Sequence, residues 1–184
     1  MKKIAEGWHS EIFLTENNTV IKKFKKELRK NYEKEKEILL RLKDYDFVPK
    51  LIRYNDETLE IEMEYIDCKN FLEVLKEKEV IKNILLKILD ICYILDKMKI
   101  EKEEMHRPYK HIFICNDRIV LIDWERAREK ENPSNVTQFI QFLIKEKYLK
   151  LDEELKNLLI LYKKSYSEKE YAKLKEFILK NIIV

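Results

Sequence analysis

The chain is poor in the residues that interrupt regular structure. Its 184 residues include one glycine and three prolines, a scarcity that argues against a loop-rich, disordered or collagen-like protein. Because 45% of the residues are hydrophobic and 40% are charged, the chain can bury a core beneath a highly charged surface. Its length suits one domain, or two small lobes that share a cleft.

Cysteine is also scarce. Cys68, Cys92 and Cys115 are odd in number and include no CxxC pair, so we expect neither a zinc site nor a disulfide framework. Cys92 lies among helically spaced apolar residues and Cys115 at the end of an expected strand. Both are interpreted as core or turn thiols and not as nucleophiles.

Long apolar runs and a strong excess of one charge are missing as well. No run reaches the roughly 18 residues that cross a membrane, and the opening Met-Lys-Lys-Ile-Ala-Glu lacks the apolar segment of a signal peptide. We therefore expect a cytoplasmic protein without a membrane span. The net charge of +3 predicts no nucleic-acid binding by itself. Residues 22–30, with six basic side chains in nine, are either a solvated helix entry or an RNA contact.

The hydrophobic pattern changes along the chain. Strands are expected at 4–5, 11–14, 19–24 and 59–66, and another begins at 47–52 but is broken by Pro49. A helix is expected over 26–43. Helices are then expected over 71–80, 84–98, 135–147, 152–164 and 168–181, interrupted by a hairpin of 111–114 and 118–122 around Asn116 and Asp117. The change in composition near 66–70 predicts a boundary between a β-rich lobe, 1–66, and a helical lobe, 67–184.

One acidic residue follows a strongly apolar run. Residues 119–122, Ile-Val-Leu-Ile, deliver Asp123 to the end of a buried strand, and Trp124 follows it. Protein kinases place the Asp of Asp-Phe-Gly in this setting, where it holds Mg²⁺ against the ATP phosphates. A carboxylate that caps a strand or the next helix gives the same local pattern, so the residues upstream must decide.

Upstream, Lys22 ends a Val-Ile-Lys run that resembles the Val-Ala-Ile-Lys strand of kinases, and Glu35 follows on the expected helix. The resemblance implies that Lys22 binds the α and β phosphates and that Glu35 fixes its ammonium. Gly7, the only glycine, would let a loop approach phosphates closely, and Ser10 would add a hydroxyl. A solvated lysine and a hairpin glycine are the simpler alternatives.

Residues 63–66, Met-Glu-Tyr-Ile, resemble the segment of small kinases that binds adenine. The resemblance implies that the Glu64 carbonyl and the Ile66 N–H pair with the base and that Met63 lies behind it. A plain strand end is the alternative.

Residues 104–111 resemble the catalytic loop of a small group of predicted archaeal-type Ser/Thr kinases. In that alignment Glu104 replaces the catalytic Asp; His106 takes this place if the loop is two residues shorter, and we prefer Glu104 as the base. His111 takes the place of the metal-binding Asn, which suits Mn²⁺ better than Mg²⁺. Lys110 would reach the γ-phosphate.

In their order along the chain these motifs resemble a small atypical protein-kinase-like family, related to RIO and lipopolysaccharide kinases. The resemblance implies an α+β, minimal bilobal protein-kinase-like fold, with a β-rich N-lobe and a helical C-lobe. It further implies an ATP-dependent phosphotransferase, Ser/Thr protein kinase-like, that uses ATP with Mg²⁺ or Mn²⁺ and an unknown protein or small-molecule acceptor. The alternatives are a nucleotide-binding pseudokinase that acts as an RNA- or protein-binding module, and a helical interaction domain with no nucleotide site.

Overall fold

The computed structural model describes all 184 residues and has an α+β architecture. The chain forms two compact units, one of Met1–Asn70 with His111–Ala127 and the other of Phe71–Lys110 with Arg128–Val184. The predicted division assigns all residues after 66 to a helical lobe, whereas His111–Ala127 here belongs to the first unit.

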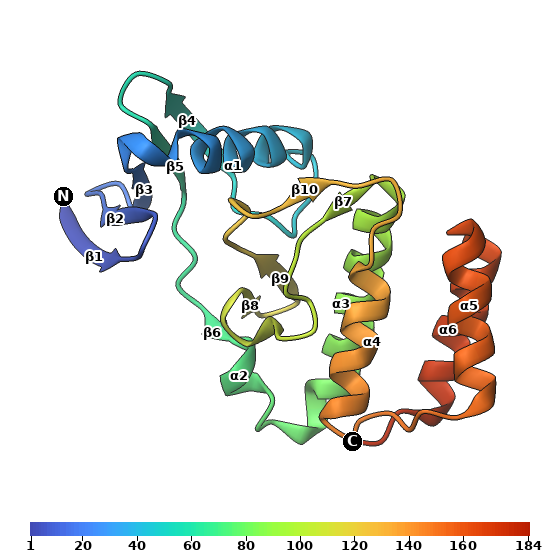
Figure 1. Cartoon of the computed structure of the whole chain (residues 1–184). Helices are drawn as coiled ribbons and strands as arrows, with labels where there is room; N and C mark the ends of the chain where they lie inside the picture. The colour runs from blue at the N-terminus through green and yellow to red at the C-terminus, as the bar shows by residue number, and fades with distance from the viewer. The chain divides into compact units, whose positions relative to one another are not determined.

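The first unit contains a five-stranded antiparallel sheet (Figure 1). In the order β1-β2-β3-β5-β4, its strands are Lys2–Glu6, Ser10–Leu14, Thr19–Phe24, Glu60–Glu64 and Leu51–Asn55. Because successive side chains in a strand point to opposite faces, Val20, Lys22 and Phe24 share one face of β3, and all three are buried.

Helix α1 (Arg29–Arg41) packs against β3, β4 and β5, after a short 3₁₀ turn, η1 (Lys26–Leu28). Its buried residues recur at helical spacing and are Tyr32, Glu35, Ile38 and Leu39. The helix predicted over 26–43 is therefore confirmed, although its first turn is 3₁₀.

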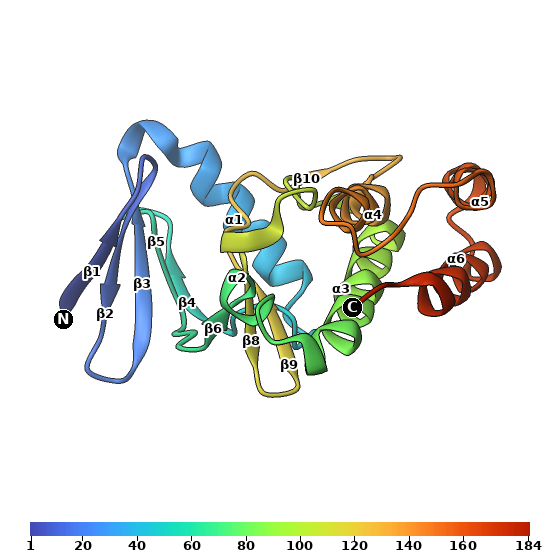
Figure 2. The same cartoon turned by 90° about the horizontal axis from the view of Figure 1, so that it is seen from below.

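A second, three-stranded antiparallel sheet in this unit has the order β6-β8-β9 (Figure 2). Its strands are Lys69–Asn70, Ile112–Cys115 and Arg118–Leu121. The predicted hairpin is confirmed, and Asn116 in its turn has a φ of 56°, which Asn tolerates better than most residues. The Leu121 N–H donates to the Phe47 carbonyl at 2.8 Å and joins the hairpin to the segment before β4.

One prediction is wrong in this unit. Cys68 and Cys115 form a disulfide, with Cα atoms 5.3 Å apart, because the pairing of Lys69 with Ile114 brings the two cysteines side by side. The break expected at Pro49 is present: the strand begins after it, at Leu51, since Pro49 has no N–H to donate to a ladder.

The second unit is helical, with α2 (Phe71–Val74), α3 (Lys78–Lys97), α4 (Asn135–Lys145), α5 (Glu153–Ser165) and α6 (Glu168–Asn181). Helix α3 packs against α4 and α6, and α5 pairs with α6 (Figures 1 and 2). Two short strands, β7 (Ile100–Glu101) and β10 (Arg128–Glu129), pair antiparallel. The later predicted helices are confirmed, but the one over 71–80 is broken after Val74.

The core of the second unit is aromatic and aliphatic. Phe139, Phe142 and Tyr162 are fully buried, as is the free thiol of Cys92, whereas Tyr148 is only half-buried. Among all the helices, none combines the length and the apolar character that spanning a membrane requires.

Candidate functional site

A buried lysine lies at the centre of the polar cluster of the first unit. Lys22 sits in β3, between β2 and β5, with 4% of its surface exposed. Its Nζ donates to Glu35 Oε2 at 2.7 Å and to Asp123 Oδ1 at 3.3 Å. Glu125 Oε2 lies 3.2 Å from the same nitrogen. Lys22 is therefore not a solvated member of the basic run, and any RNA contact would have to use the remaining residues of 22–30.

The charge of Lys22 is fixed by these carboxylates. Burial by itself lowers the pKa of the ammonium, but the attraction of Glu35, Asp123 and Glu125 outweighs it and holds the pKa above its ordinary value. Lys22 is thus protonated at neutral pH. Because desolvation opposes a buried ion pair, such a pair contributes little to stability in comparison with apolar packing. A chemical role explains its presence better.

Glu35 reaches Lys22 because α1 presents it on the buried face of the helix. It lies three residues after Tyr32 and three before Ile38, both of which are buried. Only 2% of Glu35 is exposed. The predicted pairing of Lys22 with Glu35 is therefore present in the structure.

Asp123 follows β9 in a strained backbone conformation. Its φ of 60° lies in the left-handed region, which non-glycine residues rarely occupy outside turns and functional sites. Two neighbouring hydrogen bonds hold it there: the Ile122 N–H donates to the His111 carbonyl at 2.9 Å, and the buried Trp124 Nε1–H donates to the Leu121 carbonyl at 2.9 Å. The conformation delivers the carboxylate to Lys22.

The two predicted metal ligands lie together, with His111 Nδ1 at 3.1 Å from Asp123 Oδ2. The structure contains no group of three or more His, Cys, Asp or Glu side chains arranged to hold a metal ion. Asp123 could contribute a carboxylate to a divalent cation, the type of ligand that Mg²⁺ prefers. The imidazole of His111 would suit Mn²⁺ better than Mg²⁺.

A pocket of about 200 Å³ opens beside Lys22 within the first unit. Besides Lys22, Glu35 and Asp123, its wall includes the three residues predicted to bind adenine, Met63, Glu64 and Ile66. The other lining residues include Tyr65 and the apolar side chains Ile4, Ile12, Val20, Phe113 and Ile122. Apolar walls with a few convergent polar groups are typical of sites for small ligands and cofactors.

An ion pair fixes the segment that forms one wall of this pocket. The Arg118 guanidinium of β9 donates to both carboxylate oxygens of Glu64, at 2.6 and 3.0 Å, and to the Val48 carbonyl at 3.0 Å. The hydrogen bond from Arg118 lowers the pKa of Glu64. The end of β5 is thereby tied to the hairpin that carries Asp123.

The loop between β1 and β2 contains Gly7. Its N–H donates to the Ser10 carbonyl at 2.9 Å, and a Cβ added to Gly7 would come no closer than 3.8 Å to that oxygen. Since Gly7 also has no positive φ, the local backbone does not require glycine here. Ser10 is buried at the start of β2 and shares the strand face of Ile12, which lines the pocket.

Two residues of this cluster are absent from the sequence prediction. Glu125 approaches Lys22, and its other oxygen, Oε1, lies 2.8 Å from His9 Nδ1 in the β1–β2 loop. Local spacing does not indicate either contact, because Asp123 is in the left-handed region and Glu125 lies in a turn, so that residues 123–125 are not an extended strand.

The predicted catalytic residues Glu104, His106 and Lys110 belong to the second unit. They lie between β7 and the end of a one-turn 3₁₀ helix, η2 (Pro108–Lys110). His106 and Lys110 are exposed, whereas Glu104 is half-buried and has a φ of 62°. The Arg107 N–H donates to the Glu104 carbonyl at 2.8 Å.

No family model matches the chain, and no curated protein matches it.

Proposed function

We propose that the chain is an ATP-dependent phosphotransferase with a minimal bilobal protein-kinase-like fold. The observation that carries the proposal is the buried Lys22, bonded to Glu35 at 2.7 Å and to Asp123 at 3.3 Å in the wall of an apolar pocket. A fixed ammonium next to a carboxylate at the end of a strand is the arrangement with which kinases bind the phosphates of ATP and its metal. The apolar part of the pocket would take the adenine.

In this proposal the candidate site residues of the first unit bind the nucleotide and its metal. Lys22 binds phosphate oxygens while Glu35 holds its ammonium in place, and Met63, Glu64 and Ile66 contact the base. Asp123 and His111 would hold Mg²⁺ or Mn²⁺, which when bound neutralises phosphate charge. Glu125 offers Lys22 an alternative partner when no phosphate is bound, since its Oε2 lies 3.2 Å from Nζ.

The transfer step is assigned to the loop of the second unit. The oxygen of an acceptor hydroxyl forms a bond to the γ-phosphorus, and the bond from that phosphorus to the bridging oxygen of ADP breaks. Glu104 accepts the hydroxyl proton, a role worth about 10²–10⁴-fold in rate, and Lys110 offsets the charge of the transferred group. His106 is the alternative base.

Nucleotide binding is tested first, with Lys22→Met. Wild-type protein at an ATP concentration a hundredfold above Kd should gain about 2.7 kcal/mol in unfolding free energy, and Lys22→Met should lose most of this gain. Lys23→Met is the matched control, because Lys23 is exposed on the same strand and pairs only with Glu60, at 3.4 Å. Equal ATP affinity in wild type and Lys22→Met would refute the assignment.

The control is needed because removing one partner of a buried ion pair costs about 3–5 kcal/mol. ATP binding is therefore measured by calorimetry at a temperature at which circular dichroism shows the variant to be folded. If Lys22→Met does not fold, Lys22→Arg, which keeps a cation beside Glu35, takes its place. Its ATP affinity should also fall, since the longer planar guanidinium cannot reproduce the ammonium position.

A nucleotide-binding pseudokinase is the second candidate. It is favoured by the contact of His111 with Asp123 Oδ2, because a metal would have to compete for that carboxylate. Phosphate transfer from radiolabelled ATP, measured in Mg²⁺ and in Mn²⁺, separates the two functions. In an enzyme, Glu104→Gln should slow transfer by about 10²–10⁴-fold with ATP affinity intact, and His106→Ala should have a milder effect.

A further inference from the structure

The loop that carries Glu104 contains two adjacent residues with unfavourable backbone conformations. Glu103 has a φ of 67° and Glu104 a φ of 62°. Neither side chain gives the advantage that Asn or Gly has in this left-handed region. Residues in such conformations persist only where the surrounding structure over-determines them, so other groups must hold this loop.

On the N-terminal side the loop is held by a buried amide at the start of α4. The Lys102 N–H donates to Asn135 Oδ1 at 2.9 Å. Asn135 Nδ2 donates to the Ile100 carbonyl at 2.7 Å and to Asp96 Oδ1 at 2.8 Å. Since Asn135 is completely buried and its side-chain amide is bonded at both ends, its orientation is fixed.

Asp96, on α3, in turn fixes the start of α4. Its carboxylate accepts the Asn135 N–H at 3.0 Å and the Tyr162 hydroxyl at 2.7 Å. The carboxylate therefore caps α4, where backbone N–H groups lack helical partners. This cap positions the first turn of α4 relative to α3.

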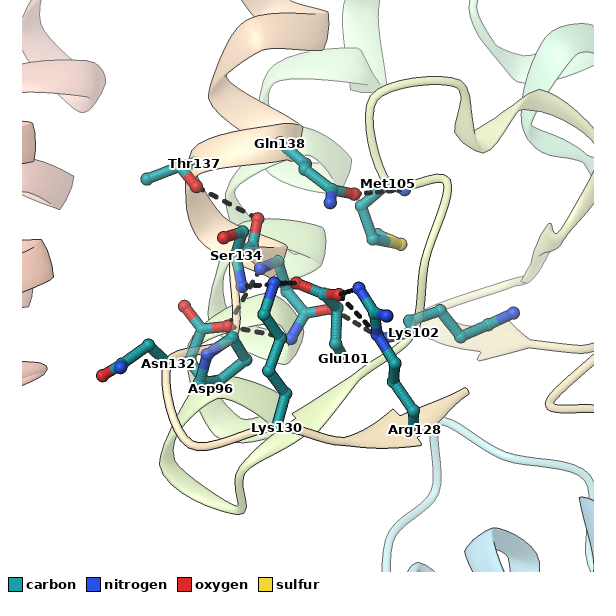
Figure 3. A network of polar contacts seen from close by, with 12 residues as sticks. Asp96, Glu101, Lys102, Met105, Arg128, Lys130, Asn132, Ser134, Thr137 and Gln138 are labelled. Atoms are coloured by element: carbon teal, nitrogen blue, oxygen red, sulfur yellow. Dashed lines mark hydrogen bonds and ion pairs between the residues drawn. The ribbon is translucent and has the colours of Figure 1, made fainter. Parts of the chain in front are cut away.

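On the C-terminal side of Glu103 and Glu104, the loop is held by a second side-chain amide of α4, that of Gln138. The Met105 N–H donates to Gln138 Oε1 at 3.1 Å (Figure 3). Gln138 lies three residues after Asn135, so both side chains are on one face of α4. The Met105 side chain is buried, which restricts the loop further.

A third anchor lies at Glu101, just before the loop. Its buried carboxylate pairs with Arg128 at 2.7 Å and Lys130 at 3.0 Å, and it accepts the Ser134 N–H at 3.2 Å. The loop is thus tied to the first turns of α4 at Glu101, Lys102 and Met105 (Figure 3). Glu103 and Glu104 are the residues between the two amide contacts.

We propose that Gln138 is a positioning residue for Glu104: by holding the Met105 N–H it keeps Glu104 in the left-handed conformation that presents its carboxylate to the acceptor hydroxyl. This inference rests on the proposed phosphotransferase function. Gln138 acts through the backbone and touches no substrate. Without its amide oxygen, Glu103 and Glu104 can relax to ordinary φ values and turn the carboxylate away.

The test compares three variants of the full chain. Gln138→Leu removes the acceptor at similar volume, Gln138→Glu keeps an acceptor oxygen at the same distance along the side chain, and Gln141→Leu makes the same change at an exposed position of α4. For each variant, kcat, the KM for ATP and the hydrogen exchange rate of the Met105 amide are measured.

In Gln138→Leu, kcat should fall about ten- to hundredfold, the effect of a misplaced catalytic group. The KM for ATP should stay unchanged, and the Met105 amide should exchange faster. Gln138→Glu should restore kcat, and Gln141→Leu should resemble wild type. A purely structural role would not produce this separation of kcat from KM, nor its rescue.

Wild-type kcat in Gln138→Leu, in a protein whose Glu104→Gln variant is severely impaired, would overturn the positioning role and leave the proposed function standing. So would a loss of kcat in Gln138→Leu that Gln138→Glu does not restore. If the wild-type protein binds ATP and transfers no phosphate to any acceptor or to water, the phosphotransferase function itself fails, and the role of Gln138 fails with it.

Discussion

Lys22 and Lys23 are neighbours in a basic run and yet have opposite environments. On β3 their side chains point to opposite faces of the sheet, so that Lys22 is buried among carboxylates and Lys23 is exposed beside Glu60. A local count of charges cannot separate the two, whereas the period of the strand can. The chemistry of the site depends on this alternation.

Gly7 has a backbone conformation that alanine can also adopt. Neither its φ nor its surroundings require glycine, because an added Cβ would be 3.8 Å from its nearest neighbour, the Ser10 carbonyl oxygen. We expect Gly7→Ala to change the unfolding free energy by no more than about 1 kcal/mol, in the stabilising direction, through the unfolded chain.

If Gly7 serves a close approach to phosphates, the same variant should bind ATP more weakly while it binds adenosine normally. The measurement is a pair of titrations with ATP and adenosine. A Gly7→Ala protein with wild-type affinity for both ligands would assign Gly7 to the hairpin alone.

Among the secondary structure elements, the short strand β6 has an influence beyond its length. It pairs with β8 and brings Cys68 against Cys115. The disulfide joins residues 47 positions apart, and closing a loop of this size restricts the unfolded chain substantially. It links the segment after the pocket wall at 63–66 to the hairpin that leads to Asp123.

Breaking this link should therefore destabilise the protein. We expect the double variant Cys68→Ser, Cys115→Ser to lose about 2–4 kcal/mol of unfolding free energy relative to oxidised wild type, as measured by urea titration. A phosphine reductant should lower the melting temperature of wild type and leave that of the double variant unchanged. Identical melting of wild type with and without the reductant would show that the disulfide does not contribute.

For the whole molecule, the pocket residues and the loop residues belong to different units. Every residue that lines the pocket lies in Met1–Asn70 or His111–Ala127, whereas Glu104, His106 and Lys110 lie in the helical unit. A bound ligand stabilises mainly the groups that it contacts against local opening. Nucleotide should therefore protect the two units unequally.

Hydrogen exchange of the intact chain measures this difference. Saturating ATP should slow amide exchange in β2, β3, α1 and β9 and leave the rates in α5 and α6 close to those of the free protein. Lys22→Met under the same conditions should show no protection. Protection of α5 and α6 that equals or exceeds that of β3 would contradict the location of the nucleotide in the first unit.

Most of the secondary structure follows from local signals in the amino-acid sequence. The strand predicted over 19–24 and the helix over 168–181 have the predicted bounds, because hydrophobic period and capping residues are local signals. Among the residues of the candidate site, Asp123 stands out as a carboxylate after an apolar run. Lys22 and Glu35 have neighbours of the same type, and they are selected by their positions on the expected strand and helix and by the resemblance to kinases.

Which of these residues come into contact depends on how the elements pack. Lys22 and Asp123 are 101 residues apart in sequence. Three other contacts likewise join separate elements: Glu125 with Lys22, the disulfide of Cys68 with Cys115, and the hydrogen bond from the Met105 N–H to Gln138. Such contacts depend on strand pairing and helix packing, which the periodicity of one segment does not specify. The grouping of His111–Ala127 with the β-rich unit has the same cause, since it follows from the pairing of β8 with β6 and the bond from Leu121 to Phe47.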